Sequence, residues 1–336
     1  MTHRAELATT LLLVALLLAA LVVGPGDVSL STALEIVGRR LTGGVPDPSA
    51  PTLDALVWDL RVPRALCAAV VGAALGIAGA VTQGLLRNPL AEPGVLGISA
   101  GAATFAVFGF ALGLDALGLW ITPGLAAIGA AVSLALLLWI CVDASRVATV
   151  LLTGIALASV AGAITTLMLA VSSERWDLGL KIVRWLMGSF EGRSWAHLGA
   201  ALVPTLVGLA AALWLRVDLD ALSLGHDTAH SLGVQLPRLR RVALATIALL
   251  VGTATALCGV IGFVGLVVPH IVRLAAGPGH GRLLPLSALA GAAGLLAVDV
   301  LTRALTTVVI PPGVVTALVG GPVLVWLLRR HGEGAT

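Results

Sequence analysis

Apolar residues in this chain form long runs that are separated by short polar segments. A run of about 20 apolar residues is long enough to cross a bilayer as one helix. We therefore predict an all-α polytopic membrane protein with about ten transmembrane helices. The predicted spans are residues 5–24, 62–86, 94–114, 116–142, 147–171, 195–216, 240–257, 259–276, 283–303 and 308–328.

The first run follows the short polar sequence Met1-Thr-His-Arg. A cleaved signal peptide is the alternative interpretation, but the run is long and lacks a small-x-small cleavage site. We interpret it as a transmembrane helix. Residues 25–60 are polar and rich in Pro and Gly, and we expect an external loop there. The whole chain, residues 1–336, then forms a single transmembrane domain.

Tryptophan positions support these spans. Trp120 and Trp139 bracket the fourth span, and Trp195 and Trp214 bracket the sixth. Each pair is 19 residues apart, or roughly 28 Å along a helix, close to the thickness of the hydrocarbon core. Aromatic rings are enriched at both membrane interfaces, so each pair predicts the two ends of a span.

Small residues recur every four positions in the second span, at Gly72, Gly76, Ala80 and Gly84. On a helix they form one ridge almost without side chains. In water such glycines weaken a helix, whereas in a bilayer the ridge allows another helix to approach closely. We therefore predict that these four residues pack against a neighbouring helix. Arg87-Asn88-Pro89 then interrupts the apolar run with a charge, an amide and a helix breaker.

The composition narrows the possible functions. Hydrophobic residues make up 58% of the 336 residues and charged residues only 11%, against roughly a quarter charged in soluble domains. The net charge of +3 is too small to suggest nucleic acid as a partner. Cys67, Cys141 and Cys258 lie far apart in apolar runs, so we expect small core residues rather than a disulfide or metal pattern.

The two halves of the chain share a weak pattern. Gly79 to Pro89 and Gly259 to Pro269 each run from a glycine through an apolar, glycine-rich stretch to a proline. If the second and seventh spans enter from opposite sides, this match predicts an inverted repeat of the transporter kind.

Basic residues suggest an orientation, because Lys and Arg favour the cytoplasmic side. The clearest cluster flanks the polar segment 217–238, and two further arginines lie near the C-terminus; the residues are Arg216, Arg238, Arg240, Arg241, Arg329 and Arg330. We predict that both termini and residues 217–238 are cytoplasmic.

Several kinds of chemistry are disfavoured. The only lysine, Lys181, is followed by Ile182, so the chain has no Walker A loop. Gly97–Gly101 matches G-x-S-x-G, but it opens a membrane helix instead of a strand-turn-helix with a His and an acid nearby. His226 and His230 are four residues apart without an evident third metal ligand.

Ion coupling is also disfavoured. Intramembrane acids usually mark ion-coupled carriers, yet few are present here. Asp299 and Arg303 are four residues apart and are expected to pair near the end of the ninth span. An ion-coupled secondary transporter remains the alternative, with a membrane-embedded hydrolase that would use Ser99 as a more distant one.

The segment Ala221–Val234 is unusual for a connecting loop. It is predicted to form short helices broken at Gly225 and Gly233, with apolar residues around the two turns. Such a segment can dock into a groove on a soluble protein.

These features together resemble the FecCD-type family of permease subunits, which serve ABC importers of vitamin B12, ferric siderophores and haem. The matching motifs cover about residues 60–330. They are Arg61–Arg64, Gly72–Ala102 with Gln83 and Asn88–Pro93, Leu151–Ala156, Trp185–Gly188, Ala221–Val234, Ile261–Arg273 and Pro312–Gly320.

The resemblance implies a homodimer of ten-helix subunits of the ABC type II importer kind in the inner (cytoplasmic) membrane. It also implies two cytoplasmic ATPases and an external substrate-binding protein. ATP and Mg would bind the partner ATPase, and no cofactor is expected in this chain. Three sets of residues match family sites. They are the ATPase-coupling residues Leu224, Gly225, His226, Asp227, Ala229, Leu232 and Gly233; the gate residues Gln83, Asn88, Pro89 and Leu90; and the binding-protein docking residues Arg61, Arg64 and Arg303.

The chain also departs from the family. Pro is common where Val260 stands, and an acid-Leu-Pro sequence is common at Val309–Pro311. His226 and His230 replace a common Glu and Arg, and Arg146–Thr149 does not match the small hydroxyl residues seen near the gate in some members. Despite these departures, the resemblance predicts a non-enzymatic permease that imports a large iron chelate, haem or cobalamin. It does not specify which substrate, nor a homodimer over a heterodimer with a paralogue.

Overall fold

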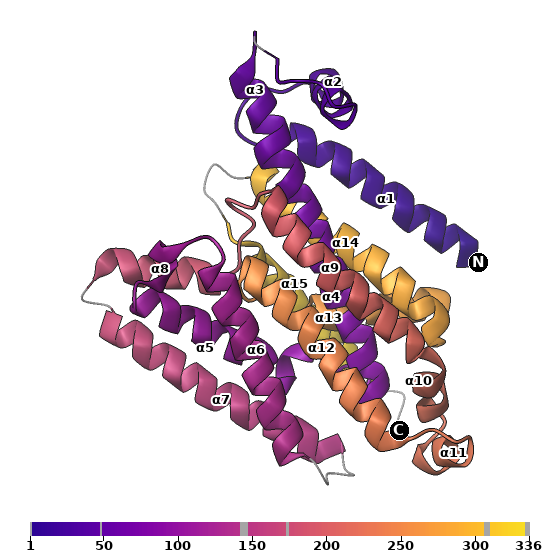
Figure 1. Ribbon diagram of the computed structural model, residues 1–336. Coiled ribbons are helices and arrows are strands. Elements are labelled where there is room, and N and C mark those ends of the chain that lie inside the picture. The colour runs from indigo at the N-terminus through magenta and orange to yellow at the C-terminus, as the bar shows by residue number, and fades with distance from the viewer. Residues whose placement is uncertain (1, 48, 142–146, 173–174, 306–309, 333–336) are drawn as a thin grey trace.

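The computed structural model describes residues 2–47, 49–141, 147–172, 175–305 and 310–332. This part of the chain is helical and contains no strand (Figure 1). One apolar helix lies in each predicted span. They are α1 (Thr2–Val22), α4 (Val62–Leu85), α5 (Ile98–Ala111), α6 (Ile121–Ile140), α7 (Val147–Ser172), α9 (Trp195–Trp214), α12 (Leu236–Cys258), α13 (Val264–Ala276), α14 (His280–Leu305) and α15 (Pro312–Gly332).

Among the described residues, seven helices are long and apolar enough to cross a membrane, and three shorter apolar helices accompany them. The shorter ones are Ile98–Ala111, Val264–Ala276 and the described apolar part of α15, Pro312–Val325. Trp195 and Trp214 are the first and last residues of α9, and Trp120 directly precedes α6, as the tryptophan spacing predicted.

Further helical segments connect these helices. They are α2 (Leu30–Leu41), α3 (Pro51–Ala55), the π-helical turn η1 (Leu56–Arg61), the 3-10 turns η2 (Pro93–Leu96) and η3 (Leu114–Leu117), α8 (Trp176–Leu186), α10 (Arg216–Ser223) and α11 (His226–Ser231). Residues 25–60 are therefore not the plain loop that their Pro and Gly content predicted. In α2, Ala33 and Ile36 are buried while Leu34 and Leu41 are exposed, so this helix lies on the surface of the bundle.

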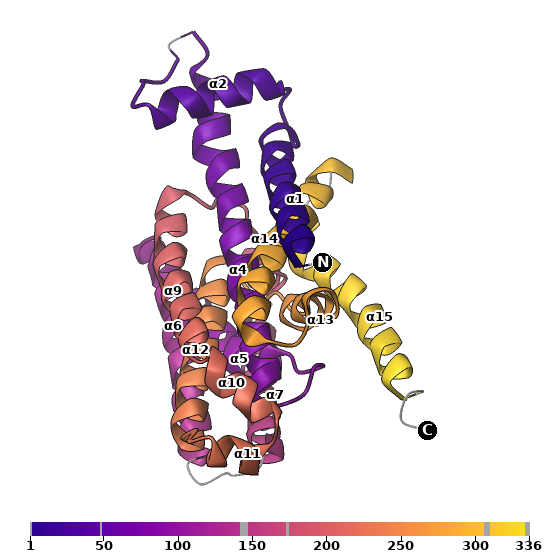
Figure 2. The ribbon, with the colours of Figure 1, turned by 90° about the vertical axis from the view of Figure 1, so that its right-hand side faces the viewer.

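α4 is the central helix of the bundle. It packs against α9, α12, α13 and α14, and most of its residues are buried. α2 and α3 lie at one end of α4, and α10 and α11 lie at the other (Figures 1 and 2). We call these the α2 end and the α11 end of the molecule.

Two helices are shorter than their predicted spans because the backbone breaks before them. Span 259–276 contains α13 only from Val264, since Gly259 (φ +79°) and Phe263 (φ +67°) adopt left-handed conformations that interrupt the helix. Span 94–114 begins with η2, and Gly97 (φ +78°) then turns the chain into α5. Irregular backbone therefore lies next to both short helices.

The segments that suggested an internal repeat differ in local structure. Residues 79–89 form the end of α4 and a turn, whereas residues 259–269 form an irregular segment and the start of α13. The order of helices nevertheless recurs: α4–α7 and α12–α15 each run long, short, long, long. α4 and α12 start from opposite ends of the bundle (Figure 1), which is the arrangement of an inverted repeat.

Candidate functional site

The α11 end carries two short helices that bury one face and expose their tips. α10 and α11 bury Leu219, Leu222 and Ala229 completely or almost completely. Leu224 and Leu232 are 66% and 63% exposed. The segment is thus anchored by one set of apolar residues and presents another set outward.

Glycines with positive φ shape this segment. Gly225 (φ +122°) separates α10 from α11, and Gly233 (φ +86°) follows α11. Residues with a Cβ rarely adopt these conformations. Asp227, also expected at this site, is exposed, and so is His230 one turn later.

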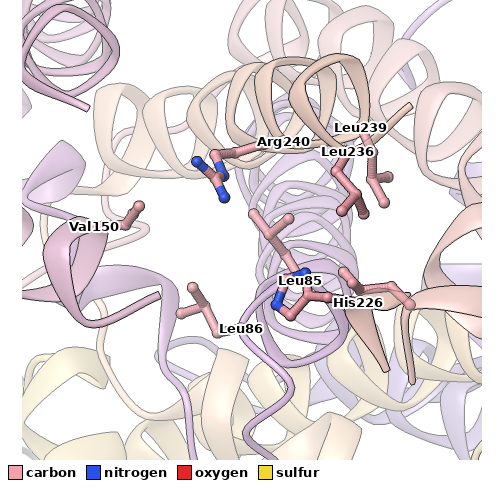
Figure 3. Close-up of a pocket in the computed structure, with 8 residues that line it drawn as sticks. Leu85, Leu86, Val150, His226, Leu236, Leu239 and Arg240 are labelled. Atoms are coloured by element: carbon pink, nitrogen blue, oxygen red, sulfur yellow. The ribbon is translucent and has the colours of Figure 1, made fainter. Parts of the chain in front are cut away.

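His226 is the expected coupling residue that turns inward. It lines a pocket where α11 meets the end of α4, together with Leu85, Leu86, Val150, Leu222, Leu236, Leu239 and Arg240 (Figure 3). Figure 3 shows the imidazole of His226 beside Leu85, with the Arg240 side chain coming from α12. The pocket therefore joins the α10–α11 segment to the last turn of α4.

The expected gate residues lie at and just after the end of α4. Gln83 is buried, and its amide donates to the carbonyl of Leu266 in α13 over 3.1 Å. Asn88 is exposed, and its Oδ1 accepts a hydrogen bond of 2.9 Å from the N–H of Leu90, which closes a tight turn around Pro89. Arg87, with a φ of +50°, begins this turn.

Glu92, which no sequence pattern singled out, follows this turn. Its Oε1 accepts a hydrogen bond of 2.5 Å from the N–H of Phe263, the residue that precedes α13. Because the first N–H groups of a helix have no partner within the helix, a carboxylate is stabilised there. This contact ties the segment between α4 and α5 to the break before α13.

The ridge of small residues lies where α4 meets α14. A Cβ atom at Gly72 would overlap the carbonyl oxygen of Gly291, and one at Gly76 would overlap that of Ser287. At Gly84 it would overlap the imidazole of His280. Ala80 is fully buried. The two backbones therefore approach as closely as the four-residue spacing predicted.

Arg61 lies at the α2 end and is 4% exposed. Its Nη1 donates to the carbonyls of Leu21 (2.6 Å) and Val22 (3.0 Å), and its Nη2 donates to those of Pro25 and Gly26 (2.8 Å each). These carbonyls lie at and beyond the end of α1, where the helix provides no donors. The expected role of Arg61 as a docking residue conflicts with this placement, because its donors are occupied inside the protein.

Arg64 and Arg303 share one buried carboxylate. Asp299 is fully buried, and its Oδ1 accepts from Nε (3.0 Å) and Nη2 (2.8 Å) of Arg64. Nη2 of Arg303 lies 3.0 Å from the other oxygen, which confirms the expected Asp299–Arg303 pair. Nη1 of Arg303 also donates to the carbonyl of Val23 over 2.7 Å. The three arginines thus hold α1, α4 and α14 together. The side chain of Arg64 nevertheless stays 19% exposed.

A second polar network, which no sequence pattern predicted, covers the α2 end. Asp54 is 1% exposed and pairs with Arg39 (2.5 Å) and Arg40 (2.7 Å). The ring of Trp58, just after Asp54 in the chain, lies 4.7 Å from that of Trp195 in α9. Hydrogen bonds from Ser49 lower the pKa of Asp47, which also pairs with Arg39. These contacts hold the segment 25–60 onto the bundle.

Ser99 is not placed as a hydrolase nucleophile would be. It lies in the first turn of α5, and no strand precedes it in the described part of the chain. A Cβ atom at Gly101 would overlap Oγ of Ser133, so this glycine of the motif serves the packing of α5 on α6. The three cysteines are free, and they are buried as core residues, as expected. Arg146 and Val309, where the chain departs from the family pattern, lie outside the described residues.

Comparisons with known proteins agree with this architecture. The sequence profile of the FecCD transport family matches residues 11–330. The vitamin B12 import permease BtuC of Vibrio cholerae is 44% identical over 286 residues, which cover 83% of this chain and 84% of that protein. The cobalamin import permease BtuC of Halobacterium salinarum is 37% identical over 96% of this chain and 95% of its own.

A solved structure also matches. It shows an inward-facing transporter assigned to the metal-chelate ABC type, with a TM-score of 0.83 and 32% identity. The match covers 95% of this chain and 98% of that one. The profile, the relatives and the solved structure span nearly the same residues as the helical bundle described above. This multi-pass membrane protein belongs to the FecCD transport family.

Proposed function

We propose that this chain is the permease subunit of an ABC importer, which carries a cobalamin-type corrinoid into the cytoplasm. The observation that carries the proposal is the α10–α11 segment, which is anchored by buried apolar residues and exposes Leu224 and Leu232. An amphipathic segment of this kind fits a groove on a soluble partner. In an ABC transporter that partner is the ATPase, which this chain needs because it has no Walker A loop.

In this proposal the α11 end is cytoplasmic. Arg216, Arg238 and Arg241 are exposed there, and cytoplasmic segments are enriched in basic residues. The guanidinium of Arg238 lies 5.2 Å from the centre of the Trp214 ring, which places a cation and an aromatic ring together as at a membrane interface. The α2 end is then external and both termini are cytoplasmic.

The proposed gate comprises Gln83, Asn88, Pro89 and Leu90. Their position at the α11 end supports this role. His226 of the ATPase-docking segment shares a pocket with Leu85 and Leu86, which lie next to the gate residues at the end of α4. A displacement of α11 would therefore reach the turn at Asn88 through directly packed residues.

The proposed assembly contains a second copy of the chain, two ATPases and an external substrate-binding protein. Most of α7 is uncovered in the single chain, with Leu152, Val160 and Val171 each at least 60% exposed. This apolar surface is compatible with lipid and with a second copy. Of the three arginines expected to dock the binding protein, Arg64 is the remaining candidate, because part of its side chain stays exposed.

The substrate proposal follows the relatives. Two of the similar permeases are named for vitamin B12 or cobalamin import, while the similar solved structure is of the metal-chelate type. A corrinoid is therefore the first substrate to test, and a ferric siderophore or haem is the second. An ion-coupled secondary carrier is disfavoured, since the buried Asp299 is already paired with two arginines.

The test is uptake into proteoliposomes. The purified chain is reconstituted with its partner ATPase and binding protein, and uptake of labelled cobalamin is measured with and without ATP. We expect uptake that requires ATP and stops when the Walker A lysine of the partner ATPase is replaced. Uptake that continues after this replacement but stops when an ionophore is added would establish a secondary carrier instead. Uptake of a ferric siderophore or haem in place of cobalamin would correct the substrate alone.

A further inference from the structure

One polar contact joins the α10–α11 segment to the core of the bundle. Asp220 lies on α10, one helical turn before the exposed Leu224. Its Oδ1 lies 2.6 Å from Nδ1 of His280 and accepts a hydrogen bond of 2.9 Å from the backbone N–H of the same residue. His280 is the first residue of α14. Asp220 therefore holds the beginning of α14 through both the backbone and the side chain.

The His280 ring is confined on its other side by α4. It is 1% exposed, and a Cβ atom at Gly84 would overlap its Nε2. Within the described part of the chain, Nε2 has no hydrogen-bond partner. The geometry accordingly assigns the ring proton to Nδ1, which donates to Asp220. One imidazole thus contacts α10 and α4 while belonging to α14.

α4 and α14 form a tightly packed pair beyond this point. The close approaches of Gly72 to Gly291 and of Gly76 to Ser287 bring the two backbones into direct contact, so we expect the pair to move as a packed unit. A displacement that reaches the start of α14 would therefore move both helices together. α10 packs against both of them, as Figure 2 shows at the lower end of the bundle.

The last turn of α4 is itself connected to α13. Nη2 of Arg273, near the end of α13, lies 3.5 Å from Oε1 of Gln83. Gln83 in turn donates to the carbonyl of Leu266. Because α10 packs against α14 and α4, Asp220 lies on a helix that contacts the helix of the proposed gate.

We propose that the Asp220–His280 contact transmits the displacement of the ATPase-docking segment to α14 and α4. Asp220 and His280 are then positioning residues for transport. This inference rests on the proposed function of the chain as an ABC permease. It adds a named contact through which ATP hydrolysis in the partner opens or closes the pathway. The exposed leucines bind the ATPase, and Asp220 connects that surface to the helices that must move.

The experiment compares variants at Asp220 in the reconstituted complex, with uptake and ATP hydrolysis measured together. In Asp220→Ala we expect normal assembly and continued ATP hydrolysis, but at least roughly tenfold less uptake per ATP, because both hydrogen bonds that His280 donates to the carboxylate are lost. Asp220→Asn keeps an acceptor oxygen and should restore most of the uptake. Asp218→Ala is the matched control, because Asp218 lies on the same helix and the described residues include no hydrogen bond from its side chain to α14.

A second pair of variants tests the contact from the other side. His280→Leu keeps most of the ring volume and the backbone hydrogen bond but loses the ring donor, so we expect it to uncouple transport less than Asp220→Ala does. His280→Asn keeps an N–H group near the position of Nδ1 and should retain more coupling. Combining Asp220→Ala with His280→Leu should lower uptake no further than Asp220→Ala alone, because that change already removes both hydrogen bonds.

The outcomes separate this inference from the proposed function. If the wild type takes up substrate with ATP and Asp220→Ala shows the same uptake per ATP, the inference is overturned and the proposed function stands. A lower thermal midpoint without a change in uptake per ATP would likewise overturn it, since it would indicate a structural role alone. Absence of ATP-driven uptake by the wild type would refute the proposed function and this inference with it.

Discussion

Arg61 and Arg303 show how the partners of a charged residue decide its role. Both donate to backbone carbonyls at or just past the end of α1, and Arg303 also pairs with the buried Asp299. A guanidinium carries five N–H groups, so one side chain can satisfy several carbonyls that a helix end leaves unpaired. At this position the arginines serve the assembly of the bundle.

This placement leads to a prediction for Arg61. Arg61→Ala should lower the thermal midpoint and the yield of folded protein, because buried carbonyls without a donor cost about 1–3 kcal/mol. The measurement is thermal unfolding in detergent, monitored as the loss of monodisperse protein with temperature. Arg184→Ala is the control, since Arg184 is exposed on α8. Unchanged stability together with weaker docking of a binding protein would return Arg61 to the docking role.

At the scale of elements, the contact between α4 and α14 is extensive and close. Glycines on both helices, among them Gly72 and Gly291, allow the two backbones to touch. Such contacts stabilise membrane helices through packing, because lipid provides no hydrophobic driving force between them. The same rigidity makes the pair suitable for moving as one body.

The α4–α14 contact predicts that a larger side chain at Gly76 strongly destabilises the protein. Gly76→Leu should disrupt assembly far more than Leu75→Val, because only the former fills the space against Ser287. Gly76→Ala should also destabilise the protein, whereas Gly162→Ala in α7 should be neutral or slightly stabilising, since open space surrounds Gly162. The fraction of monodisperse protein after heating measures each effect. Equal values for Gly76→Ala and Gly162→Ala would contradict the packing of the ridge.

For the α10–α11 segment we predict that substitutions weaken partner binding without destabilising the fold. Leu224→Ser and Leu232→Ser should leave the fold intact but weaken ATPase binding, each by about 2 kcal/mol if they are central to the interface. Leu41→Ser is the matched control, because Leu41 is 73% exposed at the α2 end. Affinity of the partner ATPase for the chain in nanodiscs is the measurement. Equal weakening by Leu41→Ser would show that the docking surface lies elsewhere.

At the scale of the whole molecule, the two ends differ in construction. The α2 end is closed by ion pairs around Asp54 and Asp299, while the α11 end exposes arginines and the tips of two short helices. The charge asymmetry supports one orientation in the membrane.

Cysteine labelling tests that orientation directly. Cys67, Cys141 and Cys258 are buried, so the background reactivity of the native protein should be low. In intact cells, Leu41→Cys should react with a membrane-impermeant maleimide, whereas Leu232→Cys should react only after permeabilisation. The reverse pattern would invert the proposed topology, and with it the assignment of the ATPase side.

The sequence alone determined the membrane class, the approximate position of each span, the ridge at Gly72, Gly76, Ala80 and Gly84, and the family. These properties depend on hydrophobicity and on residue spacing along one helix, which are local in the chain. Helix breaks were harder to place. The break before α13 depends on the conformation of Phe263 and on the hydrogen bond that its N–H donates to Glu92, a residue far away in the sequence.

Only the tertiary structure decided which partners the charged residues have. Arg64 meets Asp299 across 235 positions of the chain, and Asp220 meets His280 across 60. A buried charge must find an opposite charge or several hydrogen bonds, but the choice among candidates depends on which helices lie side by side. For that reason the sequence pattern identified Arg61, Arg64 and Arg303 as a group, and the structure assigned them to the joints between α1, α4 and α14.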